Sequence, residues 1–178
     1  PEWPRPERIR VGPLVNYGYS GETPLLMSAR VTGSSGKARA ELDAEWLVCR
    51  EECVPAGARL AWEAPIARSG RSEPAFTALL GRHEHRFPRP AAGWRVSAWG
   101  EGTLRLEAEL PAGARVPESA QFFPREPLVL DHAAEQPFKR SPRGFELALT
   151  PAPEAEGPPR TLAGVLVLEG GESFEVEA

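Results

Sequence analysis

The stretch that decides the fold is Lys37-Ala38-Arg39-Ala40-Glu41-Leu42-Asp43-Ala44-Glu45-Trp46-Leu47-Val48. Its even positions are all apolar, whereas its odd positions up to residue 45 are all charged. Such a period of two is typical of a β-strand with one face on a core and the other in water. The alternation returns in Arg59–Glu63, with Leu60 and Trp62 expected inside, and in Thr103–Leu110.

Other segments predict further short elements. Apolar runs predict strands over Leu25–Val31, Trp94–Trp99, Phe145–Leu149, Leu162–Leu168 and Phe174–Val176. A single helix is predicted from Pro74 to about His83, because apolar residues recur there at helical spacing and Pro88 follows. The 20 Pro and 17 Gly among 178 residues indicate many short elements joined by turns. This combination favours an all-β chain built of sandwiches.

The two halves of the chain resemble each other weakly. Trp3-Pro4-Arg5 is similar to Phe123-Pro124-Arg125, and residues 24–29 are similar to residues 144–149, at an offset of about 120 residues. We therefore expect two related sandwich domains, over residues 1–68 and 93–178, joined by a short helix-containing linker over residues 69–92. The first domain is expected to lack its first strands, because only the second has strands ahead of its Phe-Pro-Arg. Chance similarity between two β-rich halves is the alternative.

Composition excludes several classes of function. The formal net charge of −4 and the absence of a basic run argue against binding to nucleic acid. No apolar run reaches the roughly 18–20 residues that span a bilayer, so no direct membrane insertion is expected. No phosphate-binding loop or triad of catalytic residues stands out, and no cofactor is expected.

Two cysteines, the only ones in the chain, are the strongest candidates for a functional site. Cys49 and Cys53 lie where the strand alternation ends and a turn begins, with Cys49 in register with the outward, polar positions. A disulfide between them would close a very small ring, which constrains the unfolded chain little and so adds little stability. This favours chemistry over a structural bridge, although an inert bridge is the alternative. Of the intervening residues, Arg50 would stabilise a thiolate, while Glu51 and Glu52 would oppose it.

No metal site is expected. Two thiolates need further ligands to hold a metal, and the three histidines lie far from the cysteines in the sequence. His83 and His85 stand on a charged segment that is more typical of a surface than of a metal site, and His132 is isolated.

Residues 12–21 and the segment Trp46-Leu47-Val48-Cys49-Arg50-Glu51-Glu52-Cys53-Val54-Pro55 resemble the periplasmic N-terminal region of DsbD-type thiol:disulfide interchange proteins. The resemblance is to the branch linked to suppression of copper sensitivity, the ScsB-like proteins, and it extends to the tail over residues 162–176. The family's best-known members separate their cysteines by more residues than this chain does.

The resemblance implies immunoglobulin-like modules in the periplasm that form the ectodomain of a membrane protein. Such a module takes electrons from a membrane-embedded domain of the same protein and passes them to thioredoxin-like periplasmic proteins. Cys53 would meet the partner and Cys49 would resolve the mixed disulfide. Tyr17 and Tyr19 would form a lid over the disulfide, with Gly18 giving the lid backbone freedom. The alternative is that one or both tyrosines pack on the edge of a sandwich.

Overall fold

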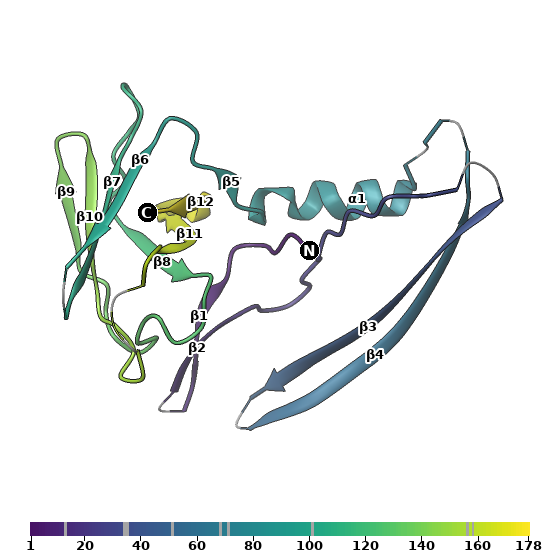
Figure 1. Ribbon diagram of the computed structural model, residues 1–178, viewed down its shortest axis with the longest axis horizontal. Coiled ribbons are helices and arrows are strands. Elements are labelled where there is room, and N and C mark those ends of the chain that lie inside the picture. Colours follow the sequence, from purple (N-terminus) through teal and green to yellow (C-terminus); the bar gives the residue numbers. More distant parts are fainter. Residues whose placement is uncertain are drawn as a thin grey trace.

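The computed structural model describes residues 1–12, 14–33, 36–50, 52–67, 69–70, 72–100, 102–155, 157 and 159–178. Strands are the main regular elements of the described residues (Figure 1). A β-sandwich occupies the C-terminal half, a short hairpin from the N-terminal segment lies against it, and a long hairpin extends away beyond a single α-helix (Figure 1). The predicted all-β class with a sandwich is confirmed.

The sandwich is made of two four-stranded sheets. The first sheet is antiparallel, in the order β6 (Arg95–Trp99), β7 (Leu104–Glu109), β10 (Gly144–Leu149) and β9 (Phe138–Ser141). The second has the order β5 (Arg89–Pro90), β12 (Ser173–Glu177), β11 (Ala163–Leu168) and β8 (Ala120–Pro124), with β5 parallel to β12. Short 3-10 turns cover Glu84–Arg86 and Glu169–Gly171.

The core of the sandwich follows from the alternation in its strands. Leu104, Leu106 and Ala108 of β7 are buried, as the sequence predicts, and Phe145, Leu147 and Leu149 of β10 are fully buried opposite them. Alternate side chains of a strand point to one face, so each sheet presents an apolar face to the other. The core cluster is drawn entirely from residues 91–178.

The N-terminal hairpin consists of β1 (Glu7–Val11) and β2 (Leu14–Gly18). Arg8 of β1 joins it to the sandwich, because its Nη2 donates to the carbonyl oxygens of His132, Ala133 and Ala134 at 2.8, 3.1 and 3.2 Å. A guanidinium presents several donors in a fixed plane and suits such a cluster of carbonyls. This contact fixes where β2 and its tyrosine lie.

The helix and the long hairpin complete the chain. The helix α1 (Pro74–His83) has the predicted bounds, with Pro74 in its first turn, where a missing N–H costs nothing. The hairpin pairs β3 (Lys37–Cys49) with β4 (Cys53–Pro65) over 13 residue pairs. The predicted strand over residues 59–63 is therefore longer than expected.

Two sequence-based expectations are wrong. The first is that the even positions of the 37–48 segment, with Leu60 and Trp62, pack on a core. Trp46, Leu60 and Trp62 are instead 47%, 55% and 60% exposed, because β3 and β4 pair only with each other and no described residue buries that face.

The second is the strand predicted over Leu25–Val31, where only Leu26 forms a bridge, with Glu2. Each of these two residues donates its N–H to the other's carbonyl oxygen, at 2.7 and 3.2 Å. The next hydrogen-bonded pair along an antiparallel ladder would be Pro4 and Pro24. Neither proline has an N–H, so the ladder does not extend from Leu26 toward Pro24.

The described strands of residues 1–68 form two separate two-stranded sheets. The division into domains over residues 1–68 and 93–178, with a linker over residues 69–92, stays a prediction.

Candidate functional site

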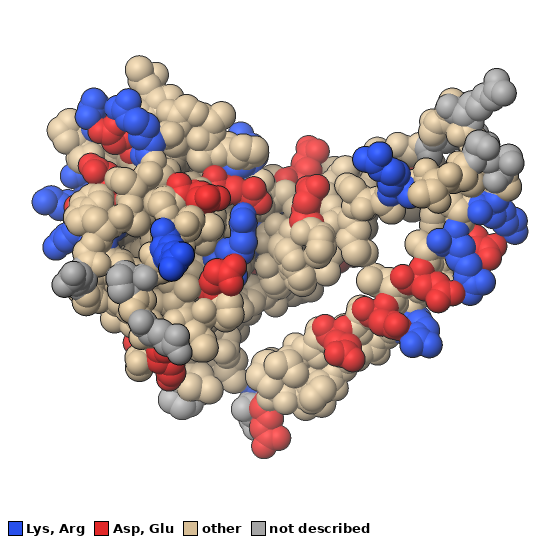
Figure 2. Space-filling view, in the orientation of Figure 1, with Lys and Arg blue, Asp and Glu red and all other residues tan. Residues whose placement is uncertain are grey.

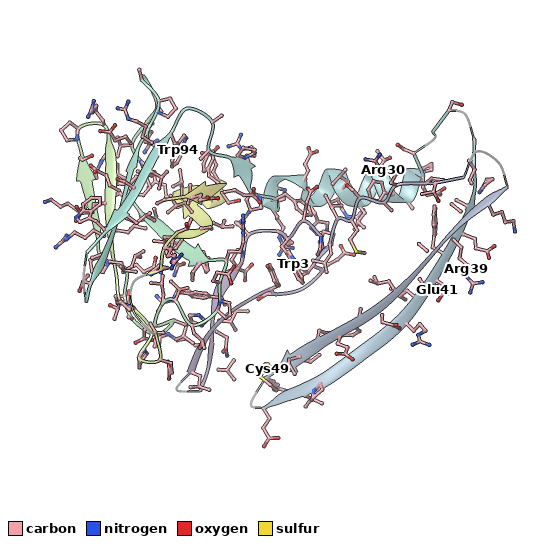
Figure 3. The ribbon with its side chains drawn as sticks, viewed as in Figure 1. Trp3, Arg30, Arg39, Glu41, Cys49 and Trp94 are labelled. Carbon is pink, nitrogen blue, oxygen red and sulfur yellow. A yellow bond between two sulfur atoms is a disulfide. The ribbon has the colours of Figure 1, made fainter. Side chains whose placement is uncertain are left out.

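The two cysteines lie at the tip of the long hairpin. Cys49 is the last residue of β3 and Cys53 the first of β4, and the two are directly opposite in the antiparallel register. Their Cα atoms are 4.0 Å apart, and a disulfide joins their sulfurs. Figure 3 shows Cys49 at the turn end of the hairpin, which is the end opposite Lys37 and Pro65. The pairing of β3 with β4 thus brings the two sulfurs together.

Both cysteines are exposed. Cys49 follows the odd-numbered positions of β3, so it shares a face with the charged side chains, as the sequence predicts. Cys53 is the first residue of β4, so a turn position does not give it better access than Cys49. An incoming thiolate can approach a disulfide placed in this way, and access to the sulfur is a requirement of exchange.

The turn that joins the two cysteines carries charge of both signs. Arg50 and Glu52 are exposed, and the N–H of Arg50 donates to the carbonyl oxygen of Glu52 at 3.1 Å. Glu51, expected to oppose a thiolate, lies outside the described residues. Further from the tip on the same face, Arg59 pairs with Asp43 at 2.6 Å. A thiol in exposed, charged surroundings is more reactive than a thiol buried among apolar side chains, because apolar burial disfavours the thiolate.

Tyr17 packs on the edge of the sandwich. Its ring stacks on His132, with 3.9 Å between the ring centroids, and meets Phe123 edge to face at 4.8 Å. Gln136 Nε2 donates to the Tyr17 hydroxyl over a long 3.5 Å. Burial raises the pKa of the Tyr17 hydroxyl, and burial also lowers the pKa of His132. Both pKa shifts favour the neutral form of the ring, at the junction of the hairpin and the sandwich.

Tyr19 follows the end of β2 and stacks on Trp3, with 5.7 Å between the ring centroids. Burial raises the pKa of its hydroxyl as well. The two tyrosines and Trp3 line one cleft of about 640 Å³ between the N-terminal segment and the sandwich. Gly18, expected to give the segment freedom, is the last residue of β2 and pairs with Glu7. The two tyrosines pack against the rings of Trp3, Phe123 and His132. A role of the tyrosines as a lid over the disulfide stays a prediction.

A lid over the disulfide would slow the reduction of the Cys49–Cys53 bond. If Tyr17 or Tyr19 shields the disulfide, replacing it with Ala is expected to raise the second-order rate of reduction of the Cys49–Cys53 bond by glutathione at matched pH, because the rate of exchange depends on access to the sulfur. Leu14→Ala is the control, since Leu14 lies on the same strand and is 64% exposed. Unchanged rates in both tyrosine variants would mean that these residues only pack against the sandwich.

The histidines lie apart from the cysteines. His83 Nε2 lies 2.8 Å from a carboxylate oxygen of Glu22, and His132 is stacked on Tyr17. The backbone carbonyl of His85 accepts a hydrogen bond from Arg5 at 3.4 Å. Among the described residues, no group of three or more His, Cys, Asp or Glu side chains is arranged to hold a metal ion.

Three residues that position the tyrosine hairpin were not found from the sequence. They are Arg8, Trp3 and Gln136, and Gln136 also bonds the backbone N–H and carbonyl of Phe122, at 2.7 and 2.8 Å. Each of the three contacts a residue more than 10 positions away along the chain. The spacing of residues in the sequence does not predict contacts at such a separation.

The sequence matches no protein-family model and no curated protein. The fold does match a solved structure, the N-terminal periplasmic domain of ScsB from Proteus mirabilis, with a TM-score of 0.66. The match covers 99% of this chain and 70% of that one, at 13% sequence identity. The chain therefore shares its fold with the N-terminal periplasmic domain of ScsB, in agreement with the resemblance that the cysteine segment suggests.

Proposed function

We propose that this chain is a thiol–disulfide exchange module that works through a reversible bond between Cys49 and Cys53. The observation that carries the proposal is the placement of the disulfide, which is exposed at the tip of a hairpin and joins the last residue pair of the β3–β4 ladder. A bridge that served stability would gain most by closing a long loop, and this one spans only four positions. The shared fold with a ScsB domain supports the same function.

The proposed reaction moves two electrons to a partner protein. The Cys53 thiolate attacks one sulfur of the partner's disulfide, forms a mixed disulfide and releases the other partner sulfur as a thiolate. The Cys49 thiolate then attacks Sγ of Cys53, so the mixed disulfide breaks and the second partner sulfur leaves. The partner ends as a dithiol, with two protons taken up, and the Cys49–Cys53 bond is formed again.

The proposed partners come from the family resemblance of the cysteine segment, which the shared fold supports. We propose that the module lies in the periplasm as the ectodomain of a larger membrane protein. It would receive electrons from a dithiol in the membrane-embedded domain of that protein and would pass them to thioredoxin-like proteins. The matched ScsB domain is itself periplasmic. No helix among the described residues is long and apolar enough to cross a membrane.

The reduction potential of the Cys49–Cys53 bond tests this function. A relay is expected to titrate between about −270 and −120 mV, the range of thioredoxin-like and periplasmic redox proteins. Equilibration with glutathione or dithiothreitol redox buffers, followed by thiol labelling and mass measurement, gives the value. The Cys49→Ser/Cys53→Ser variant provides the unlabelled baseline. A potential below about −300 mV is typical of structural bridges. Such a value would favour the alternative, a redox-inert binding ectodomain or a copper-handling surface with an inert bridge.

A further inference from the structure

The face of the long hairpin that carries the disulfide changes in character next to the cysteines. Most of its length is charged, as in the ion pair between Arg59 and Asp43. Nearer the tip, Leu47 and Pro55 are directly opposed, and each stands two residues from a cysteine. Alternate residues of a strand share a face, so both lie on the same face as the disulfide. In Figure 2 the charged side chains are spread along the hairpin, up to a mostly uncharged stretch beside its tip.

Leu47 and Pro55 form one apolar patch. The Cα atoms of the two cysteines are 4.0 Å apart, which identifies theirs as a pair without mutual backbone hydrogen bonds. The two kinds of pair alternate along an antiparallel ladder, so Leu47 and Pro55 also belong to the kind whose side chains approach more closely. Leu47 is 63% exposed, and Pro55 is exposed as well. The patch therefore lies in water, about 7 Å along the strands from the disulfide.

The patch borders a groove of about 530 Å³. On this face the next opposed pair is Glu45 and Gly57, and only one of these two residues has a side chain beyond its Cα atom. The groove thus has an apolar end toward the disulfide and an acidic end away from it. The residues that line it are Glu45, Trp46, Leu47, Pro55, Ala56 and Gly57.

The carboxylate of Glu45 is available to a ligand. The neighbouring carboxylate of Asp43 pairs with Arg59 at 2.6 Å. That of Glu41 pairs with Arg39 at 2.7 Å. Among the described residues, no lysine or arginine forms an ion pair with Glu45, which is exposed. A carboxylate in this position favours a ligand that carries a basic side chain.

The exchange reaction itself determines what lies over this groove. A mixed disulfide joins the partner's sulfur to Sγ of Cys53, so the residues that flank the partner's cysteine must lie against the hairpin tip. In an extended segment, alternate side chains project from one side at intervals of about 7 Å, the same interval that separates the disulfide, the apolar patch and Glu45. A partner segment of this kind therefore matches the groove position by position.

We propose that Leu47, Pro55 and Glu45 select the cysteine segment that reacts with the disulfide. An apolar side chain two residues from the partner's cysteine packs on Leu47 and Pro55, and a basic side chain four residues from that cysteine reaches Glu45. This inference rests on the proposed exchange function and adds to it the sequence of the preferred partner segment.

Synthetic peptide thiols test the apolar position. One peptide has leucine two positions to either side of its only cysteine, and the other has serine there. Its thiolate attacks Sγ of Cys53 and Cys49 leaves as a thiolate; a second peptide thiolate then releases Cys53 and forms the peptide disulfide. Acid quenching, alkylation and mass measurement give the second-order rate. The leucine peptide is expected to react about tenfold faster, because its side chain and the patch leave water together. Equal rates for the two peptides would overturn the proposal.

Two adjacent substitutions on opposite faces locate the effect. Leu47→Ala is expected to reduce the preference for the leucine peptide from about tenfold to about twofold. Val48→Ala should leave the preference unchanged, since Val48 is 57% exposed but lies on the face away from the disulfide. Leu47→Met should restore the preference, and glutathione should reduce the bond equally fast in all of these variants. Equal losses in Leu47→Ala and Val48→Ala, or a matching loss with glutathione, would contradict recognition by this face.

A second peptide pair tests the acidic end of the groove. Lysine four positions from the cysteine is expected to raise the rate about two- to threefold over glutamate at low ionic strength, and salt should remove the difference. Glu45→Gln should abolish it, and its persistence in that variant would overturn the role of Glu45. The rate ratios are measured with excess peptide whatever the reduction potential of the bond. A potential below about −300 mV would thus count against the exchange function, whereas a missing peptide preference would count against the groove alone.

Discussion

A Cys49→Ser variant is expected to accumulate a stable mixed disulfide with a thioredoxin-like partner, whereas Cys53→Ser should trap very little. With Cys49 removed, the bond between Cys53 and the partner has no neighbouring thiolate to resolve it, so the complex persists. Non-reducing electrophoresis of periplasmic extracts, followed by mass spectrometry of the captured band, measures the effect. The expected difference between the two variants is large, because one retains the attacking sulfur and the other loses it.

The double variant Cys49→Ser/Cys53→Ser is the control, and it should capture nothing. Equal trapping by both single variants, or trapping through Cys49 alone, would reverse the assignment of roles. This outcome has a structural basis, since both cysteines are exposed and neither is favoured by burial. Failure of both single variants to trap a partner would instead favour an inert bridge.

The double variant also separates exchange from stability. In the loop-entropy account a ring of this size contributes at most about 2 kcal/mol. The hairpin tip makes no contribution to the core cluster, which is drawn from residues 91–178. The unfolding transition of the sandwich, followed by chemical denaturation, should therefore be nearly unchanged.

The largest effect on stability is expected from Phe145→Ala in β10. Phe145 is fully buried, and its ring lies 5.3 Å from that of Phe138 and 6.4 Å from that of Trp94. Truncation of a buried Phe removes its burial and leaves a cavity, which typically costs about 3–5 kcal/mol. Urea denaturation followed by tryptophan fluorescence or circular dichroism gives the change in the free energy of unfolding.

Trp99→Ala is the matched control, an aromatic residue of the same sheet that is 45% exposed. Its loss should cost about 1 kcal/mol, since much of the ring is already in water. Similar losses from both variants would contradict the core described for the sandwich. At temperatures where Phe145→Ala remains folded, trapping through Cys53 in the Cys49→Ser/Phe145→Ala variant should persist, because the hairpin contributes no residue to the core cluster of the sandwich.

The sequence predicts the local elements well where a strong period is present. Strands β6, β7, β10, β11 and β12 lie where alternating or apolar runs predict them, and α1 has its predicted bounds. The five strands β1, β2, β5, β8 and β9 were not predicted, because they are only two to five residues long and too short to show a clear period. These strands form through pairing with neighbours, as in the register of Arg8 opposite Tyr17.

By itself the sequence determined the strand period of residues 37–48, the all-β class and the position of Cys49 at the end of a strand. The reason is that side-chain alternation and turn chemistry act between neighbours along the chain. Only the tertiary structure decided that Cys49 faces Cys53 across a turn, that Tyr17 stacks on His132 and that Trp46 and Trp62 stay exposed. Those outcomes depend on which distant segment packs on a given face. Alternation in the sequence predicts that a face is apolar, but it does not predict which segment packs against that face.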